Sequence, residues 1–98
     1  MSNNIARLKV RSKTFPNSPG VYVWRDAKRV PIYIGMAGSL KKRIASYFLA
    51  RATEKTKEMV AEACSLSFTK TASVLEAVVL EANLIKRYWP KYNVKDKD

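Results

Sequence analysis

The sequence contains no histidine and only one cysteine, Cys64, among its 98 residues. Without histidine there is no imidazole to act as a general base, and zinc sites built on histidine are excluded. A single cysteine cannot form an internal disulfide or a CxxC metal site, and we assign Cys64 to the core as a small apolar residue. These absences exclude imidazole chemistry, cysteine- or histidine-based zinc binding and a disulfide scaffold.

Long hydrophobic runs are also missing. No stretch of about 18 apolar residues occurs, and the N-terminal MSNNIARLKVRSK lacks the apolar centre of a secretion signal. We therefore expect a cytoplasmic protein without a membrane segment. The length and the hydrophobic content of 47% predict a single domain, residues 1–98, with a modest core. Within it we assign residues 1–14 to a basic N-terminal arm and residues 94–98 to a tail.

Acidic residues are scarce. The chain has 8 aspartates and glutamates against 19 lysines and arginines, a formal net charge of +11 and a pI near 10.1. So much positive charge on a small domain favours a polyanionic partner, most often nucleic acid. A surface that served solubility alone would alternate charges of both signs, with less repulsion within the molecule. We therefore predict a nucleic-acid partner.

Two segments rich in β-forming residues predict a hairpin. GVYVWR (20–25) alternates small and large side chains, DAKR (26–29) is typical of a turn, and VPIYIG (30–35) follows as a second strand. A turn of four residues would place Tyr22 directly opposite Tyr33. Opposed residues project from the same face of a sheet, so we expect the two tyrosines to lie side by side.

The rest of the chain predicts three helices and one more strand. Ser39 suits the N-cap of the first helix, and Ser73 with Glu76 forms a capping box at the start of the last. Pro90 should end that last helix. The expected segments are a helix over 40–49, a helix over 53–63, a half-buried strand over 64–70 and a helix from Ser73 to Tyr88 or Trp89. The predicted order is β-β-α-α-β-α, in the mixed α/β (α+β) class.

One residue of the last predicted helix is out of place. Projected at about 100° per residue, Glu81 falls in the middle of the apolar face. That face consists of Val74, Ala77, Val78, Leu84, Ile85 and Tyr88. An isolated carboxylate there is costly unless it is paired or binds a metal. Glu81 is therefore a candidate metal ligand. The alternatives are a buried salt bridge, with Arg43 as one partner, and a face that opens onto solvent.

These side chains suit the hydrolysis of a phosphodiester, which needs an activated water and neutralised phosphoryl oxygens. A divalent cation at Glu81 would supply part of the neutralisation, because hard cations use few protein carboxylates and keep several waters. Arg43, four residues before Tyr47, could clamp the phosphate. A tyrosine hydroxyl could orient or deprotonate the water if a nearby cation lowers its pKa from about 10. Taken singly, each of these residues also suits packing or a solvated surface.

Four blocks of sequence, in order, resemble a known family. Gly20-Val21-Tyr22 and Tyr33-Ile34-Gly35 are similar to the paired motif of the GIY-YIG nuclease superfamily. Arg43 with Tyr47, then Glu81, then Asn93 follow downstream. The stretches SPGVY, IYIGMAGSLKKRIASYF and LEAVVLEANLIKRYWPKYNV most resemble the N-terminal endonuclease domain of the bacterial excinuclease UvrC. The resemblance spans roughly residues 15–94.

The resemblance implies a compact fold in which helices flank a small antiparallel sheet of three strands. It implies one divalent cation, Mg²⁺ or Mn²⁺, held by Glu81, and a role for Tyr22 or Tyr33 in activating water. The scissile phosphate would lie beside Arg43 and Tyr47. The expected nucleic-acid contacts are Lys41, Lys42, Arg43 and Asn93, and Gly35 and Met36 are expected to be structural residues of the site.

The resemblance also implies a substrate and partners. In the family setting the domain makes the incision 3′ to a DNA lesion during nucleotide excision repair. The expected partner is DNA and, where the domain is part of a longer protein, the other excision-repair subunits. We expect the chain itself to be a monomer, either an excised domain or a free-standing relative.

Met36 departs from the family pattern, which has a lysine directly after the glycine of the second triplet. A cation that could lower a tyrosine pKa or touch phosphate is therefore missing, and Lys41 or Lys42 could take its place. Two functions stay open at this point. One is a metal-dependent DNA endonuclease, and the other is a nucleic-acid-binding module of the same fold with weak or no catalysis.

Overall fold

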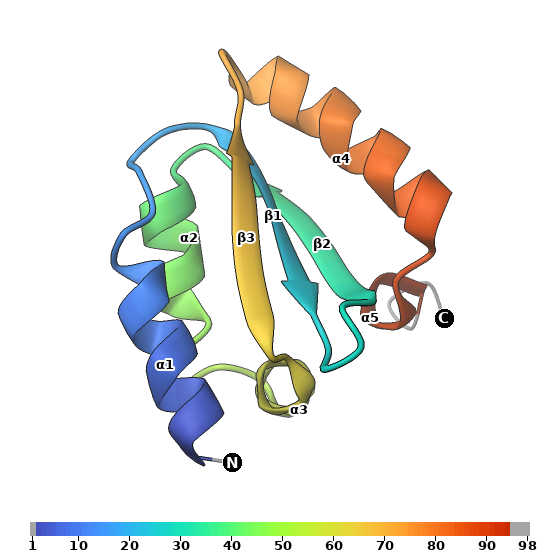
Figure 1. Ribbon diagram of the computed structural model, residues 1–98. Coiled ribbons are helices and arrows are strands. Elements are labelled where there is room, and N and C mark those ends of the chain that lie inside the picture. The colour runs from blue at the N-terminus through green and yellow to red at the C-terminus, as the bar shows by residue number, and fades with distance from the viewer. Residues whose placement is uncertain (1, 95–98) are drawn as a thin grey trace.

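A sheet of three strands lies between two layers of helices (Figure 1). The computed structural model describes residues 2–94. The elements in chain order are α1 (Ser2–Ser12), β1 (Gly20–Arg25), β2 (Pro31–Ala37), α2 (Leu40–Ser46), α3 (Glu54–Glu62), β3 (Ser65–Lys70), α4 (Val74–Tyr88) and α5 (Lys91–Val94). In Figure 1, α4 runs along one side of the sheet, whereas α1 and α2 lie on the other.

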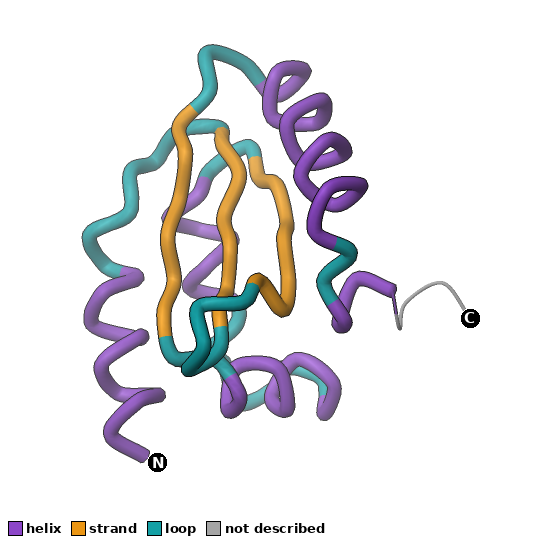
Figure 2. Tube along the Cα trace, turned by 45° about the vertical axis from the view of Figure 1, so that its right-hand side comes forward, coloured by secondary structure: helices purple, strands orange, loops and turns teal. Residues whose placement is uncertain are grey.

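The strand order is β2-β1-β3, with both pairings antiparallel. β2 is therefore an edge strand, and the proline at its first residue, Pro31, costs no hydrogen bond of a central strand. Figure 2 shows α4 and α5 beside this edge. The predicted fold class, with its three-stranded antiparallel sheet, is confirmed.

Alternate residues of β1 belong to two separate cores, because successive side chains of a strand point to opposite faces. Val21 and Val23 face α4 and pack in one cluster with Ala77. Tyr22 and Trp24 face the other layer of helices. The other buried residues of that second core are Leu8, Phe15, Ile32, Ala37, Leu40, Ile44, Tyr47, Met59, Val60, Ala63, Leu66 and Tyr92. Each side chain of the sheet therefore packs against one layer of helices or the other.

The predicted helix starts are confirmed by their caps. The Ser39 side chain accepts a hydrogen bond from the backbone N–H of Lys42 at the start of α2. The Ser73 side chain accepts one from the N–H of Glu76 at the start of α4, at 3.2 Å. α4 ends at Tyr88, directly before the left-handed residue Trp89.

The predicted order β-β-α-α-β-α is confirmed, and two further helices extend it at its ends. α1 lies within residues 1–14, where we predicted only a basic arm. Leu8 and Ser12 are its buried side chains among those described, and we interpreted the basic residues around them as a solvated arm. α5 occupies residues 91–94 and so includes the first residue of the predicted tail. Residues 95–98 of the predicted tail lie outside the described part of the chain.

The predicted register of the hairpin is wrong by two residues. Tyr22 pairs with Gly35, and Tyr33 pairs with Trp24. Arg25 pairs with Pro31, so the turn has five residues rather than four, and a bulge between Trp24 and Arg25 shifts the register by one residue more. A shift of two residues keeps every side chain on its own face, and the two tyrosine rings still lie 6.5 Å apart on the same face.

The apolar face of α4 also differs from the prediction. Val74, Val78 and Tyr88 are 43–48% exposed, whereas Ala77 is buried. Leu80, Leu84 and Ile85 are partly buried and pack against the core of that layer. The face that contacts the sheet is therefore rotated from the predicted one. Glu81 lies on this face, one turn after Ala77 and one turn before Ile85, and is partly buried.

Candidate active site

Three tyrosines from three elements meet at one end of the core between the sheet and α2. Tyr22 comes from β1, Tyr33 from β2, and Tyr47 is the C-cap of α2. The hydroxyl groups of Tyr22 and Tyr47 form a hydrogen bond of 2.5 Å. The Tyr47 ring lies 5.6 Å from the Tyr22 ring and 6.4 Å from the Tyr33 ring. The sequence motifs therefore do bring these three side chains together.

Gly35 makes room for this cluster. It pairs with Tyr22 across the β1–β2 ladder, and the Tyr22 ring lies over it. A Cβ on Gly35 would overlap the hydroxyl and ring carbons of Tyr22. The glycine is needed here for close approach rather than for an unusual backbone conformation, since its φ is not positive.

Arg43 holds the hydroxyl pair from the side of α2. Its Nε donates a hydrogen bond of 3.4 Å to the Tyr22 hydroxyl, and its guanidinium lies 5.8 Å from the centre of the Tyr47 ring. The hydrogen bond to Tyr22 raises the pKa of Arg43, so the group stays cationic. The predicted proximity of Arg43 and Tyr47 is confirmed.

Burial opposes ionisation of the tyrosines. It raises the pKa of Tyr33, with a smaller opposing effect from a hydrogen bond to Tyr47 and from the charge of Arg43. Burial likewise raises the pKa of the Tyr47 hydroxyl far above its ordinary value. Tyr22 and Tyr47 are 1% and 8% exposed, whereas Tyr33 is only half-buried. Tyr33 is therefore the tyrosine of the three that a bound water can reach.

Glu81 approaches the same edge from the opposite face of the sheet. The pKa of its carboxyl is raised, because the effect of burial exceeds the opposing effect of a hydrogen bond from the backbone of Met36. The Met36 side chain lies on the α4 face, since it pairs with Val21 and packs against that core. A lysine in place of Met36 would extend its ammonium group from this face, beside Glu81.

The carboxylate and the tyrosines meet around strand β2. The charges of Arg43 and Glu81 both affect the pKa of Tyr33, so Tyr33 lies within electrostatic reach of each of them. Among the described residues, however, no ion pair joins Glu81 to Arg43, so the salt-bridge interpretation fails. Within residues 2–94 no group of three or more histidines, cysteines or acids is placed to hold a metal ion. A half-buried carboxylate without such an ion pair fits a hard cation that keeps most of its waters.

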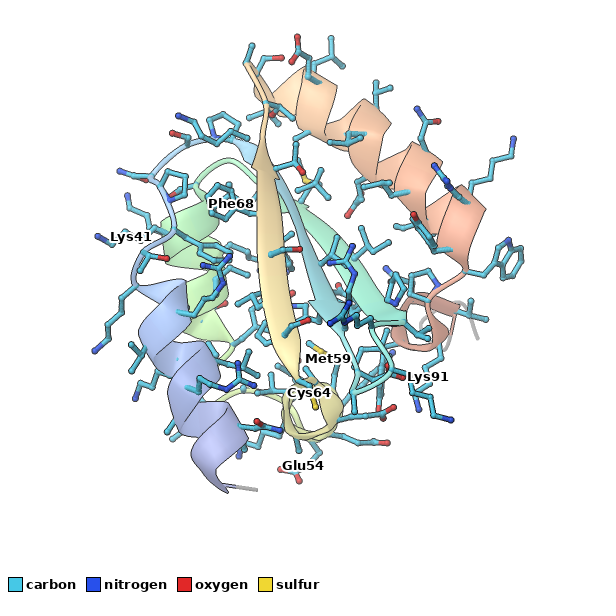
Figure 3. All side chains as sticks on the ribbon, in the orientation of Figure 1. Lys41, Glu54, Met59, Cys64, Phe68 and Lys91 are labelled. Carbon is cyan, nitrogen blue, oxygen red and sulfur yellow. The ribbon has the colours of Figure 1, made fainter. Side chains whose placement is uncertain are left out.

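The other predicted nucleic-acid contacts lie in different places. Lys42 is exposed and shares a hollow with Met36 and Arg43. Lys41 does not line that hollow, and Figure 3 shows it on the side of α2 away from α4. The Asn93 carboxamide forms two hydrogen bonds of 2.9 Å with the backbone of Ile34, donating one and accepting one. It thus pairs with the free edge of β2 as a neighbouring strand would.

Two hollows flank Arg43. The β2–α2 hollow, about 460 Å³, is lined by Met36, Ala37, Gly38, Ser39, Lys42, Arg43 and Ser46. The α2–α3 hollow, about 420 Å³, is lined by Tyr33, Arg43, Ser46, Tyr47, Leu49, Arg51, Ala52, Thr53, Lys55, Thr56, Met59 and Tyr92. The sequence did not lead us to Ser46, Leu49 or Arg51 as site residues, because none of them belongs to a motif; α2 also ends at Ser46, before the predicted end at residue 49.

No helix in residues 2–94 is long and apolar enough to cross a bilayer.

The chain is similar in sequence to proteins of one family. A family model described as "UvrC-like GIY-YIG domain" matches residues 18–94. The UvrABC system protein C of Treponema pallidum (strain Nichols) is 38% identical over 94 residues, which covers 96% of this chain and 14% of that protein. The protein of the same name from Carboxydothermus hydrogenoformans is 44% identical over 88 residues, which covers 88% of this chain and 14% of that protein.

A solved structure is similar along nearly its whole length. The GIY-YIG N-terminal endonuclease domain of UvrC from Thermotoga maritima, bound to its catalytic divalent cation, magnesium, superposes with a TM-score of 0.82. It is 41% identical in sequence, and the match covers 88% of this chain and 94% of that domain. A structure of that domain with one tyrosine replaced also has the catalytic divalent cation bound, with the same TM-score of 0.82.

Proposed function

Because this chain belongs to the family of UvrC-like GIY-YIG domains, we propose that it is a divalent-metal-dependent endonuclease domain that hydrolyses a phosphodiester bond of DNA. The observation that carries the proposal is the edge of β2, where Tyr33 lies within electrostatic reach of Arg43 on one face of the sheet and of Glu81 on the other. The net charge of +11 supports a nucleic-acid substrate.

The chain spans only about one seventh of the curated relatives that it matches, 14% of their length. We therefore propose, from the relatives alone, that the biological reaction is the incision 3′ to a lesion in nucleotide excision repair. The partners would be DNA and the other subunits of the UvrABC system, and the place of action the cytoplasm. We also propose that residues 1–98 act as one domain and one monomer.

Glu81 is the residue that would hold the divalent cation, with Mg²⁺ or Mn²⁺ as the ion. A cation bound there supplies positive charge to the phosphoryl oxygens and acidifies bound water. The protein contributes a single carboxylate, and one face of the site is left to water and substrate. The raised pKa of the Glu81 carboxyl means that binding of the cation competes with a proton.

Arg43 and the tyrosines would handle the phosphate and the attacking water. Arg43 donates to phosphoryl oxygens from its place between the two hollows. Tyr33, the most accessible of the three tyrosines, would accept the proton of water as a phenolate. Burial raises its pKa, so this role needs the charges of Arg43 and of the bound cation to favour the ionised form. The water oxygen bonds to phosphorus as the bond to the leaving oxygen breaks. Tyr22 and Tyr47 orient Arg43 through their hydrogen-bonded hydroxyls.

Asn93 is proposed as a positioning residue rather than a direct nucleic-acid contact. Its carboxamide is already engaged with both backbone groups of Ile34, next to Tyr33. It would therefore act through the edge strand. Lys42 is proposed as a phosphate contact because it is exposed beside Arg43, and Lys41 as a more distant one.

A second function, nucleic-acid binding with weak or no cleavage, is favoured by one observation. Met36 places a thioether, not a cation, against the α4 core beside Glu81. In that case the charge would still give salt-sensitive binding.

A plasmid assay decides between the two functions. Supercoiled DNA is incubated with Mg²⁺ or Mn²⁺ and the wild type, Glu81→Ala or Arg43→Ala. The endonuclease proposal expects nicking by the wild type and its loss in both variants. Equal nicking by all three proteins would point to a contaminant and remove the proposal. Binding without nicking by the wild type would establish the second function.

A further inference from the structure

The α2–α3 hollow continues from the site on the side of Arg43 away from Met36. Arg43 and Ser46 line both hollows, whereas Met36 lines only the β2–α2 hollow and Leu49 only the α2–α3 hollow. A ligand held by Arg43 can therefore extend into either one. The proposed mechanism uses Arg43, Tyr33 and Glu81, and it leaves the α2–α3 hollow without a role.

The walls of the α2–α3 hollow have two kinds of surface. Aromatic and apolar side chains form one part, and Leu49 remains 41% exposed there although it is apolar. The second kind consists of cations and hydroxyls, with Arg51 exposed on the loop after α2. The apolar and aromatic members are Tyr33, Tyr47, Leu49, Ala52, Met59 and Tyr92. The polar members are Arg43, Ser46, Arg51, Thr53, Lys55 and Thr56.

This combination fits a nucleotide better than a bare phosphate. A site for phosphate alone needs cations and hydrogen-bond donors, and an exposed leucine beside a tyrosine ring adds nothing to it. Unstacked bases, by contrast, are held by aromatic and apolar side chains while nearby cations follow the backbone. The volume of about 420 Å³ lies within the range of roughly 300–1,000 Å³ that accommodates small organic groups.

We propose that the α2–α3 hollow binds one unstacked nucleotide of the DNA strand that is cut, next to the phosphate held by Arg43. The base lies against Tyr33, Leu49 and Ala52, and Arg51 contacts the following phosphate. This inference rests on the proposed function for its ligand, DNA, but not on cleavage. The hollow thus gives the domain a preference for locally unpaired DNA, because a base in a regular duplex is held in the stack.

Binding in the absence of metal tests the hollow independently of cleavage. The dissociation constants of a labelled oligothymidylate and of an abasic chain of equal length are measured with EDTA present. For the wild type we expect the abasic chain to bind about tenfold more weakly, the size of one lost stacking contact. Ala52→Trp fills the hollow, so it should bind both chains equally and at the weaker level. Arg51→Ala should weaken the binding of both chains to a similar extent.

Two control variants test whether an added indole or a removed charge elsewhere on the surface has the same effect. Ala6→Trp adds an indole to the exposed face of α1 and should keep the full difference between the two chains. Lys9→Ala, also exposed on α1, removes one charge, and Arg51→Ala should weaken binding more than this variant does. Melting temperatures establish that all four variants are folded.

The proposal is overturned if Ala52→Trp retains the wild-type preference for bases, or if the wild type shows none, because the hollow would then hold only backbone or nothing. These outcomes are separate from the plasmid assay. A protein that does not nick DNA but shows the base preference loses the proposed function and keeps the nucleotide site. A protein that nicks DNA without the base preference keeps the proposed function and loses the nucleotide site.

Discussion

The hydroxyl groups of Tyr22 and Tyr47 lie 2.5 Å apart, and Arg43 donates to the first of them. The two tyrosines come from the central strand and from the end of α2, 25 residues apart in sequence. Their contact therefore ties α2 to the sheet beside the side chain of Arg43. The hydroxyl pair fixes the direction of the guanidinium more than it serves as a proton carrier, because burial raises the pKa of the Tyr47 hydroxyl.

Replacing Tyr47 by phenylalanine should loosen this arrangement without unfolding the domain. The Tyr22 hydroxyl, which is almost completely buried, would lose one partner, at a cost of about 1 kcal/mol in the free energy of unfolding. Nicking should fall about tenfold because Arg43 is less well oriented. Urea titration and the plasmid assay measure the two effects. Tyr88→Phe, at an exposed position, is the control and should change neither.

Gly35→Ala should be far more damaging than its size suggests. The new Cβ would overlap the Tyr22 ring, which is held between β2, Tyr47 and Arg43 and cannot move away freely. We expect a loss of about 1–3 kcal/mol in stability, the usual cost of overpacking. Gly38→Ala is the matched control, since its Cβ would meet only a Val74 methyl at 3.8 Å. Equal melting temperatures for the two variants would contradict the close approach.

Glu81 should give the metal-free protein an unusual dependence on pH. Burial raises the pKa of its carboxyl, so the folded state binds a proton more tightly than the unfolded state does. The stabilising contribution is therefore complete below the unfolded pKa of about 4.3 and is lost as the pH rises through the higher folded pKa. Glu81→Gln should abolish this decline, which melting temperatures measured across acidic pH in EDTA will detect.

Added Mg²⁺ should reverse that decline in the wild type, because the cation takes the place of the proton. It should leave the melting temperature of Glu81→Gln unchanged. Glu54→Gln serves as the control for removing a charge, since the Glu54 side chain is 95% exposed. A Mg²⁺ response that survives in Glu81→Gln would place the metal elsewhere.

Met36→Lys should raise the rate of nicking if the absence of a cation limits this chain. The ammonium group would extend from the α4 face beside Glu81, and its charge would favour the phenolate of Tyr33 or contact the phosphate. The exchange removes apolar contacts with the α4 core, so a lower melting temperature should accompany it. Met36→Leu, which keeps those contacts, should show wild-type activity. An unchanged rate in Met36→Lys would mean that other cations suffice.

Asn93→Ala should weaken the edge of β2. Both backbone groups of Ile34, which is 1% exposed, would lose a partner at 2.9 Å, and we expect a loss of about 1–3 kcal/mol. Faster hydrogen exchange at the Ile34 amide would locate the effect. Asn83→Ala, on the exposed side of α4, should leave stability and exchange unchanged.

Local signals predicted most of the fold. Ser39 and Ser73 marked their helices because a cap is a contact between residues close in sequence. Local signals could not predict the register of the hairpin, because the bulge after Trp24 depends on the packing around it. α1 was missed because few of its side chains are buried, and its Arg11 instead donates to the backbone of Leu66 on β3.

The candidate site was also predicted only in part, because it too depends on contacts between residues far apart in sequence. The resemblance predicted one site for Tyr22, Arg43 and Glu81, but it could not show that Glu81 lies on the opposite face of the sheet from the other two. Helical projection included Val74, Val78 and Tyr88 in the buried face, although they are exposed, because it cannot show how far α4 is rotated against the sheet. The α2–α3 hollow was invisible, since its loop residues, Leu49 and Arg51 among them, have no pattern of their own.

The way the last helices close over β2 has a consequence for synthesis of the protein. The tyrosines and Arg43 leave the ribosome first, and Glu81 and then α5 follow them. Until these late segments dock, the nascent chain has no carboxylate at the strand edge and no Asn93 to hold Ile34 in place. An unfinished or C-terminally truncated chain would therefore retain much of the positive charge without the means to cut, and the domain becomes a nuclease only when its translation is nearly complete.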